Sequence, residues 1–129
     1  MAYQYMNKFT IRISVNTEYL EQYSQPQRNR FAFSYTVSIE NCSDISAQLL
    51  SRHWIITDAK DNVQEVSGDG VIGEQPHISP GKKYTYKSNA ILETHAGIME
   101  GSYTMRTSAG VIINVPIPAF SLTRPQSLH

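Results

Sequence analysis

The sequence is poor in several features that would narrow its function to a familiar class. Cys42 is its one cysteine, so the chain can form neither an internal disulfide nor a cysteine metal cluster, and we expect a reducing compartment. Eleven basic and eleven acidic side chains cancel, which disfavours binding to nucleic acid or to an anionic membrane through charge. No stretch approaches the ~20 apolar residues of a membrane span, and the first residues lack an apolar signal core. We therefore expect a cytoplasmic protein without membrane insertion.

Helix patterns are also scarce, whereas strict alternation of apolar and polar residues recurs along the chain. The clearest case is residues 31–39, where Phe33 and Tyr35 fall on the apolar face. In residues 49–57, Leu50, Arg52, Trp54 and Ile56 share one face by the same count, so we expect Trp54 to be a core anchor between Leu50 and Ile56. Further strands are predicted at residues 9–15, 63–66, 83–87, 97–105 and 111–115.

About seven short strands separated by turn residues predict an all-β fold. The expected architecture is an antiparallel sandwich of the immunoglobulin or fibronectin type III kind, with Phe33, Tyr35, Trp54 and Tyr103 in its core. At 129 residues the chain fits one domain, which we place at 9–123, between a flexible leader at 1–8 and a polar tail at 124–129. Pro116 and Pro118 lack ladder donors, so the last strand is expected to be an edge or to be bulged there.

One stretch does not follow the alternation. Residues 68–73 read Gly-Asp-Gly-Val-Ile-Gly, the spacing of dinucleotide-binding loops. That motif needs a helix after it, but Pro76, Pro80 and Gly81 follow where the helix would run. A constrained loop that uses its glycines for positive φ or for close backbone approach is therefore the favoured interpretation, and nucleotide or pyrophosphate binding is a third choice.

Several separated motifs resemble the ApaG family. They are residues 50–58 (Leu-Ser-Arg-His-Trp-Ile-Ile-Thr-Asp), residues 68–76 with Pro80-Gly81, and residues 99–105 (Met-Glu-Gly-Ser-Tyr-Thr-Met), and the similarity extends from about Phe9 to Leu122. The resemblance implies a fibronectin type III-like sandwich and an association with cobalt tolerance and magnesium efflux. Related domains look like protein-binding modules, and no agreed catalytic residues or cofactor come with the family.

The residues themselves offer little for catalysis or metal binding. Ser51, His53 and Asp58 or Asp69 could suggest a hydrolase triad, but no nucleophile elbow or oxyanion hole accompanies them. The four histidines lie far apart in sequence, without the short ligand pairs of metal sites. We expect no catalytic residue, no metal site and no cofactor.

The remaining hypothesis is a non-enzymatic binding module for an unidentified protein partner, with direct divalent-cation binding as the alternative. The candidate surface is Arg52, His53, Gly68, Asp69, Gly70, Gly73, Glu74 and Gln75. Glu74 and Gln75 are expected to project from the loop, and Arg52 is expected either to pack at a sheet margin or to reach Glu65 or Glu74. No nucleic acid or specific nucleotide is expected, and the chain should be a monomer or a weak homo-oligomer.

Overall fold

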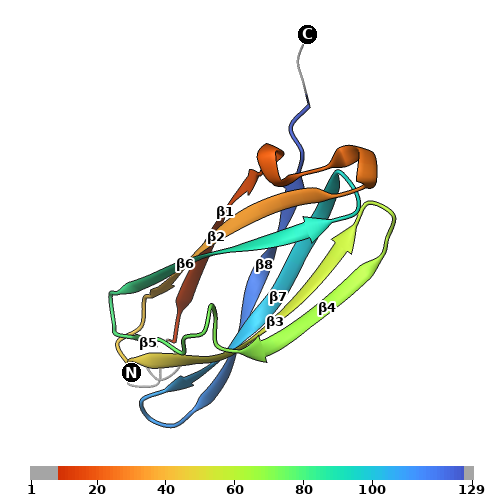
Figure 1. Cartoon of the computed structure of the whole chain (residues 1–129). Helices are drawn as coiled ribbons and strands as arrows, with labels where there is room; N and C mark the ends of the chain where they lie inside the picture. Colours follow the sequence, from red (N-terminus) through yellow and green to blue (C-terminus); the bar gives the residue numbers. More distant parts are fainter. Residues whose placement is uncertain (1–8, 127–129) are drawn as a thin grey trace.

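Two antiparallel β-sheets pack face to face in the computed structural model, which describes residues 9–126 (Figure 1). The three-stranded sheet has the order β1-β2-β6, and the larger sheet has the order β4-β3-β7-β8 with the short β5 beside β3. The strands are β1 (Ile11–Tyr19), β2 (Phe31–Asn41), β3 (Ala47–Asp58), β4 (Val63–Asp69), β5 (His77–Ile78), β6 (Lys83–Leu92), β7 (Ala96–Thr107) and β8 (Ile112–Thr123). The predicted sandwich is confirmed, and the strand predicted at 83–87 continues to Leu92.

The long polar connection between β1 and β2 contains two single-turn 3₁₀-helices, η2 (Glu21–Tyr23) and η3 (Pro26–Arg28). Asn29 ends η3 in the left-handed conformation, with φ of 54°, which asparagine tolerates better than most residues. Ser24 ties this connection to the sheet, because its hydroxyl donates to the Leu20 carbonyl and accepts from the Ala32 amide, each at 2.8 Å.

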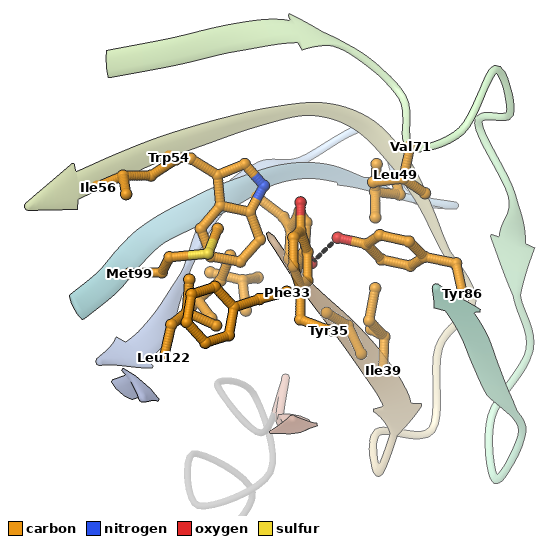
Figure 2. Packing of buried hydrophobic residues seen from close by; sticks show 14 of the residues in the cluster. Phe33, Tyr35, Ile39, Leu49, Trp54, Ile56, Val71, Tyr86, Met99 and Leu122 are labelled. Atoms are coloured by element: carbon orange, nitrogen blue, oxygen red, sulfur yellow. Dashed lines mark hydrogen bonds between the residues drawn. The ribbon is translucent and has the colours of Figure 1, made fainter. Parts of the chain in front are cut away.

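The core lies between the sheets and is built around aromatic side chains (Figure 2). Phe33, Tyr35, Trp54 and Tyr103 are all buried. The Trp54 ring meets Tyr35, Tyr103 and Phe120 edge-on, with centroids 5.5, 6.2 and 5.8 Å away. Such edge-to-face contacts add to the stabilisation that burial of the rings already provides.

The face predicted for the start of β3 is wrong. Leu49 is fully buried and Leu50 is only half-buried, because the register of β3 against β7 shifts between Leu49 and Ser51. A β-bulge puts one extra residue into a strand, so the alternation changes parity across it. Trp54 and Ile56 face the core as expected, but before the bulge the core residues of this strand are Ala47 and Leu49.

Buried Asn41 at the end of β2 holds the turn that follows. Its side-chain amide donates to the carbonyls of Ile45 and Ile78 at 2.9 Å, and its side-chain oxygen accepts from the Ser43 amide. Because all of these groups are bonded, the polar side chain is accommodated without the cost of an unpaired buried group.

The sheets differ in their number of long strands, and this leaves one strand uncovered. β1 lies against β8, so three strands face three of the four long strands of the other sheet. Among the strands of residues 9–126 none lies opposite β4, and β4 and β6 are free edges on that side of the sandwich. On the other side, β8 is the edge strand that Pro116 and Pro118 predict.

The described chain contains no helix of the length and apolar character that crossing a bilayer requires. Of the predicted tail, Arg124 to Gln126 are described, and Arg124 is anchored rather than loose. Its amide donates to His95, and its guanidinium lies about 6 Å from the ring centroids of Tyr19 and Phe31. The predicted leader and residues 127–129 fall outside the described part of the chain.

Candidate functional site

The bulged residue of β3 is the anchor for the glycine-rich segment. The carbonyl of Leu50 accepts hydrogen bonds from the Gly70 amide and from the Gln75 side chain, both at 2.8 Å. One residue earlier, the Leu49 amide donates to the Pro76 carbonyl at 3.0 Å. The bulge therefore turns backbone groups of β3 towards residues 70–76 and fixes this segment against the strand.

Each glycine of the motif has a separate structural role. Gly70 has φ of +62°, and a side-chain carbon there would lie 2.2 Å from the Glu74 carbonyl oxygen. Gly73 has φ of +80° but open space around it. Gly68 belongs to β4, and a side chain there would meet the guanidinium of Arg52 at about 3 Å.

A pyrophosphate loop needs free amides at the start of a helix, and no helix follows residues 68–73 as far as residue 126. The segment continues through a turn into β5, and the amides of Gly70, Val71 and Glu74 already donate to carbonyls within the protein. The fold therefore accounts for all three glycines without a bound nucleotide.

Residues Val71 to Glu74 form a two-residue hairpin, which we call the hairpin tip. The amides of Val71 and Glu74 each donate to the carbonyl of the other, at 2.8 and 2.9 Å. The two residues between them, Ile72 and Gly73, have φ of 43° and 80°, as in the type I′ turns that join antiparallel strands. Val71 is fully buried, whereas Ile72 is 57% exposed.

Ile72 was missed by the sequence reasoning, although its position carries a signal. Type I′ turns strongly favour asparagine, aspartate or glycine, since both central residues have positive φ. A β-branched residue in that conformation is an outlier among protein residues. An isoleucine just before the last glycine of a tight turn could therefore have been singled out from the sequence.

The Arg52 side chain passes over Gly68 and binds the glycine-rich segment on the inner face of the larger sheet. Its Nη1 donates to the carbonyls of Asp69 at 3.0 Å and Gly70 at 2.8 Å. The expectation that Arg52 reaches Glu65 or Glu74 is wrong. It contacts backbone instead, because the absent side chain at Gly68 lets the guanidinium lie directly on β4.

His53 is on the opposite face of the sheet from Arg52, so the predicted binding residues do not form one cluster. The His53 Nε2 and Glu65 Oε2 atoms are 2.6 Å apart on the outer face. Between residues 9 and 126 no three histidine, cysteine, aspartate or glutamate side chains come together in a way that could hold a metal ion.

Glu74 and Gln75 are exposed, as expected, but both side chains also support the loop. The Tyr84 hydroxyl donates to Glu74 at 2.7 Å, and burial together with this hydrogen bond raises the pKa of Tyr84 to about 12. The Gln75 side-chain amide donates to the Leu50 carbonyl, and the backbone carbonyl of Gln75 accepts from the Gln48 side chain at 3.2 Å. The prediction that the two side chains simply project from the loop is therefore wrong in part.

A buried pair of tyrosines lies beneath the segment (Figure 2). The hydroxyls of Tyr86 on β6 and Tyr103 on β7 are hydrogen-bonded to each other and link the two sheets. Burial raises the pKa of both phenols far above the ordinary value, with the charge of an ionised partner adding to the effect at Tyr103. Burial therefore favours the neutral form of both phenols.

The chain is similar in sequence and in structure to several known proteins. The ApaG domain family model matches residues 21–107. Protein ApaG of Pseudomonas paraeruginosa is 54% identical over 119 residues, covering 92% of this chain and 94% of the relative. Protein ApaG of Thiobacillus denitrificans is 51% identical over 122 residues, covering 95% and 96%. A crystal structure from Bordetella pertussis, described as an ApaA protein, superposes with a TM-score of 0.89 at 40% identity over 92% of this chain and 97% of the other.

Proposed function

The chain belongs to the ApaG domain family, and from that premise we propose that it is a non-enzymatic protein-binding module that contacts its partner through the hairpin tip. The observation that supports this proposal is Ile72. An L-residue in the left-handed region costs about 1–2 kcal/mol, and here the cost is not offset by burial, since the side chain is 57% exposed. Strain of this kind persists where a function maintains it.

The hairpin tip has the construction of an interface anchor. Its backbone is fixed by the mutual hydrogen bonds of Val71 and Glu74 and by the burial of Val71, so little conformational freedom is lost on binding. Exposed Asp69, Glu74 and Gln75 provide polar groups next to the apolar side chain of Ile72. An apolar centre with a polar rim is the usual organisation of a protein interface.

The arrangement of nucleophiles and bases supports the non-enzymatic part of the proposal. In the part of the chain that the structure describes, no hydroxyl or thiol donates to a histidine, and the imidazole of His53 is engaged by Glu65. A partner protein would also provide an indirect route to the cobalt tolerance and magnesium efflux that the family resemblance implies.

Site-specific photo-crosslinking in living cells tests the hairpin tip directly. Benzoylphenylalanine at position 72 should give a discrete cross-linked species. The matched control is position 63, because Val63 is similarly exposed, at 64%, and lies at the opposite end of β4. Equal yields from both positions, or none from position 72, would refute the proposed surface.

The cross-linked partner then allows a quantitative test with purified proteins. Ile72→Asn relieves the strain at positive φ, so the free energy of unfolding should be unchanged or raised by about 1 kcal/mol. The same substitution should weaken partner binding by about tenfold or more, because it removes the apolar anchor. Unchanged affinity in this folded variant would show that the hairpin tip is not the contact surface.

A further inference from the structure

A groove opens between the free edges of β4 and β6, away from the hairpin tip. Its volume is about 400 Å³, and its floor is formed by buried core residues, namely Trp54, Ile56 and Met99. The groove exists because β4 has no strand opposite it and because two successive inward positions of β6 carry the small residues Ser88 and Ala90, between the larger Tyr86 and Leu92. Its size is within the range of small-molecule sites.

Three residues that line this groove have hydrogen-bond donors without a partner within the described protein. In residues 9–126, the Tyr35 hydroxyl, the Trp54 indole nitrogen and the Nε and Nη2 atoms of Arg52 make no hydrogen bond, whereas Arg52 Nη1 is held by the loop carbonyls. None of these atoms is sealed from solvent without a partner. All three residues line the groove, and Figure 2 shows the nitrogen of Trp54 on the edge of the indole nearer Tyr35.

The charge that lines the groove is positive. Arg52 is the only charged residue that lines it, and no carboxylate of the described chain lies within ion-pair distance of the guanidinium. Arg52 is half-buried, and the planar donors of a guanidinium match a carboxylate in particular. A phosphate dianion is usually bound by several cationic groups. A single guanidinium next to an apolar floor instead favours a singly charged anion that carries an apolar substituent.

We propose that the groove between β4 and β6 binds a small organic carboxylate, with the carboxylate on Arg52 and an aromatic or branched apolar arm over Trp54 and Met99. The Tyr35 hydroxyl and the Trp54 N–H complete the donor set around the anion. This site is separate from the hairpin tip, so either proposal can fail without the other.

The lone tryptophan makes the proposal directly measurable, because its fluorescence reports on the floor of the groove. The probe is 4-phenylbutyrate, and the control ligand is its neutral amide. We expect a saturable fluorescence change with a dissociation constant of about 1 mM or lower for the acid, and binding at least about tenfold weaker for the amide. No saturation by the acid, or equal affinity for the amide, would overturn the proposal.

Two variants separate the site from general effects on the fold. Ala90→Leu fills the groove from β6 and leaves Arg52 and its loop contacts in place, so it should abolish the response while the circular dichroism melt stays cooperative. Arg52→Met should weaken acid binding about tenfold. Arg106→Met, a change on an exposed arginine outside the groove, should leave acid binding unaltered. A folded Ala90→Leu variant that binds the acid as well as the unsubstituted protein would also refute the assignment.

Discussion

The glycine-rich segment yields a prediction that separates the structural roles of two of its glycines. Gly70→Ala and Gly73→Ala both place an alanine at positive φ, which costs about 1–2 kcal/mol in either case. At Gly73 the new methyl group meets nothing within 4 Å, so this conformational cost is the whole effect. At Gly70 the methyl group would lie 2.2 Å from the Glu74 carbonyl oxygen, and the backbone must move.

The additional cost at Gly70 can be worked out from the bonds that this movement breaks. Displacing Glu74 disrupts its two mutual hydrogen bonds with Val71, each worth about 1 kcal/mol. We therefore expect Gly70→Ala to lower the free energy of unfolding by about 3–4 kcal/mol, against about 1–2 kcal/mol for Gly73→Ala.

Urea denaturation followed by tryptophan fluorescence measures both variants. With a slope of about 1.5 kcal/mol per molar urea, the midpoint should fall by roughly 2 M for Gly70→Ala and by roughly 1 M for Gly73→Ala. Equal midpoints for the two variants would show that the close approach of Gly70 to Glu74 does not constrain the loop, and the reasoning would fail.

Three further predictions concern the core and the tyrosines. Trp54→Ala should cost roughly 3–5 kcal/mol in the same urea assay, since it removes a ring in contact with three others, and a cost under about 1 kcal/mol would contradict this. Asn41→Ala should cost about 2–4 kcal/mol because it leaves two carbonyls and one amide without their partner, while Asn41→Asp should not restore the two donor bonds. The raised pKa of Tyr84 means that its neutral form stabilises the fold below pH 10 and that this contribution is lost as the pH rises towards about 12. In an NMR titration, Glu74→Gln should bring the Tyr84 transition back towards 10, and an unchanged transition would exclude Glu74 as a cause.

The sandwich was predictable because alternation is a local property of the sequence. Residues 31–39 alternate without interruption, and the strand that they predict exists with two further residues. The edge position of the last strand was predictable for the same reason, since proline cannot donate in a ladder. Each of these features follows from the residues of a single strand.

Features that depend on two strands together were not predictable. The bulge at Leu50 is visible only in the register of β3 against β7. Strict alternation therefore placed Leu50 in the core, where the structure has Leu49. The bonds of Arg52 to the carbonyls of Asp69 and Gly70 likewise depend on how β4 lies beside β3. The groove was likewise missed, because small residues at Ser88 and Ala90 matter only once the uncovered β4 is known.

The pairing of distant strands also determines when this chain can fold during its synthesis. Phe31 of β2 pairs with Leu92 of β6, and Ala96 of β7 pairs with Thr123 of β8, so the smaller sheet is incomplete until β6 has been synthesised and the larger sheet until β8 has been. The contact of β1 with β8 joins the first strand to the last. Domains with such non-local pairings fold on the ms–s timescale, and their apolar strands are open to association in the meantime. The apolar face of β2 therefore stays without its full set of partners from the emergence of Phe31 from the ribosome until that of Thr123.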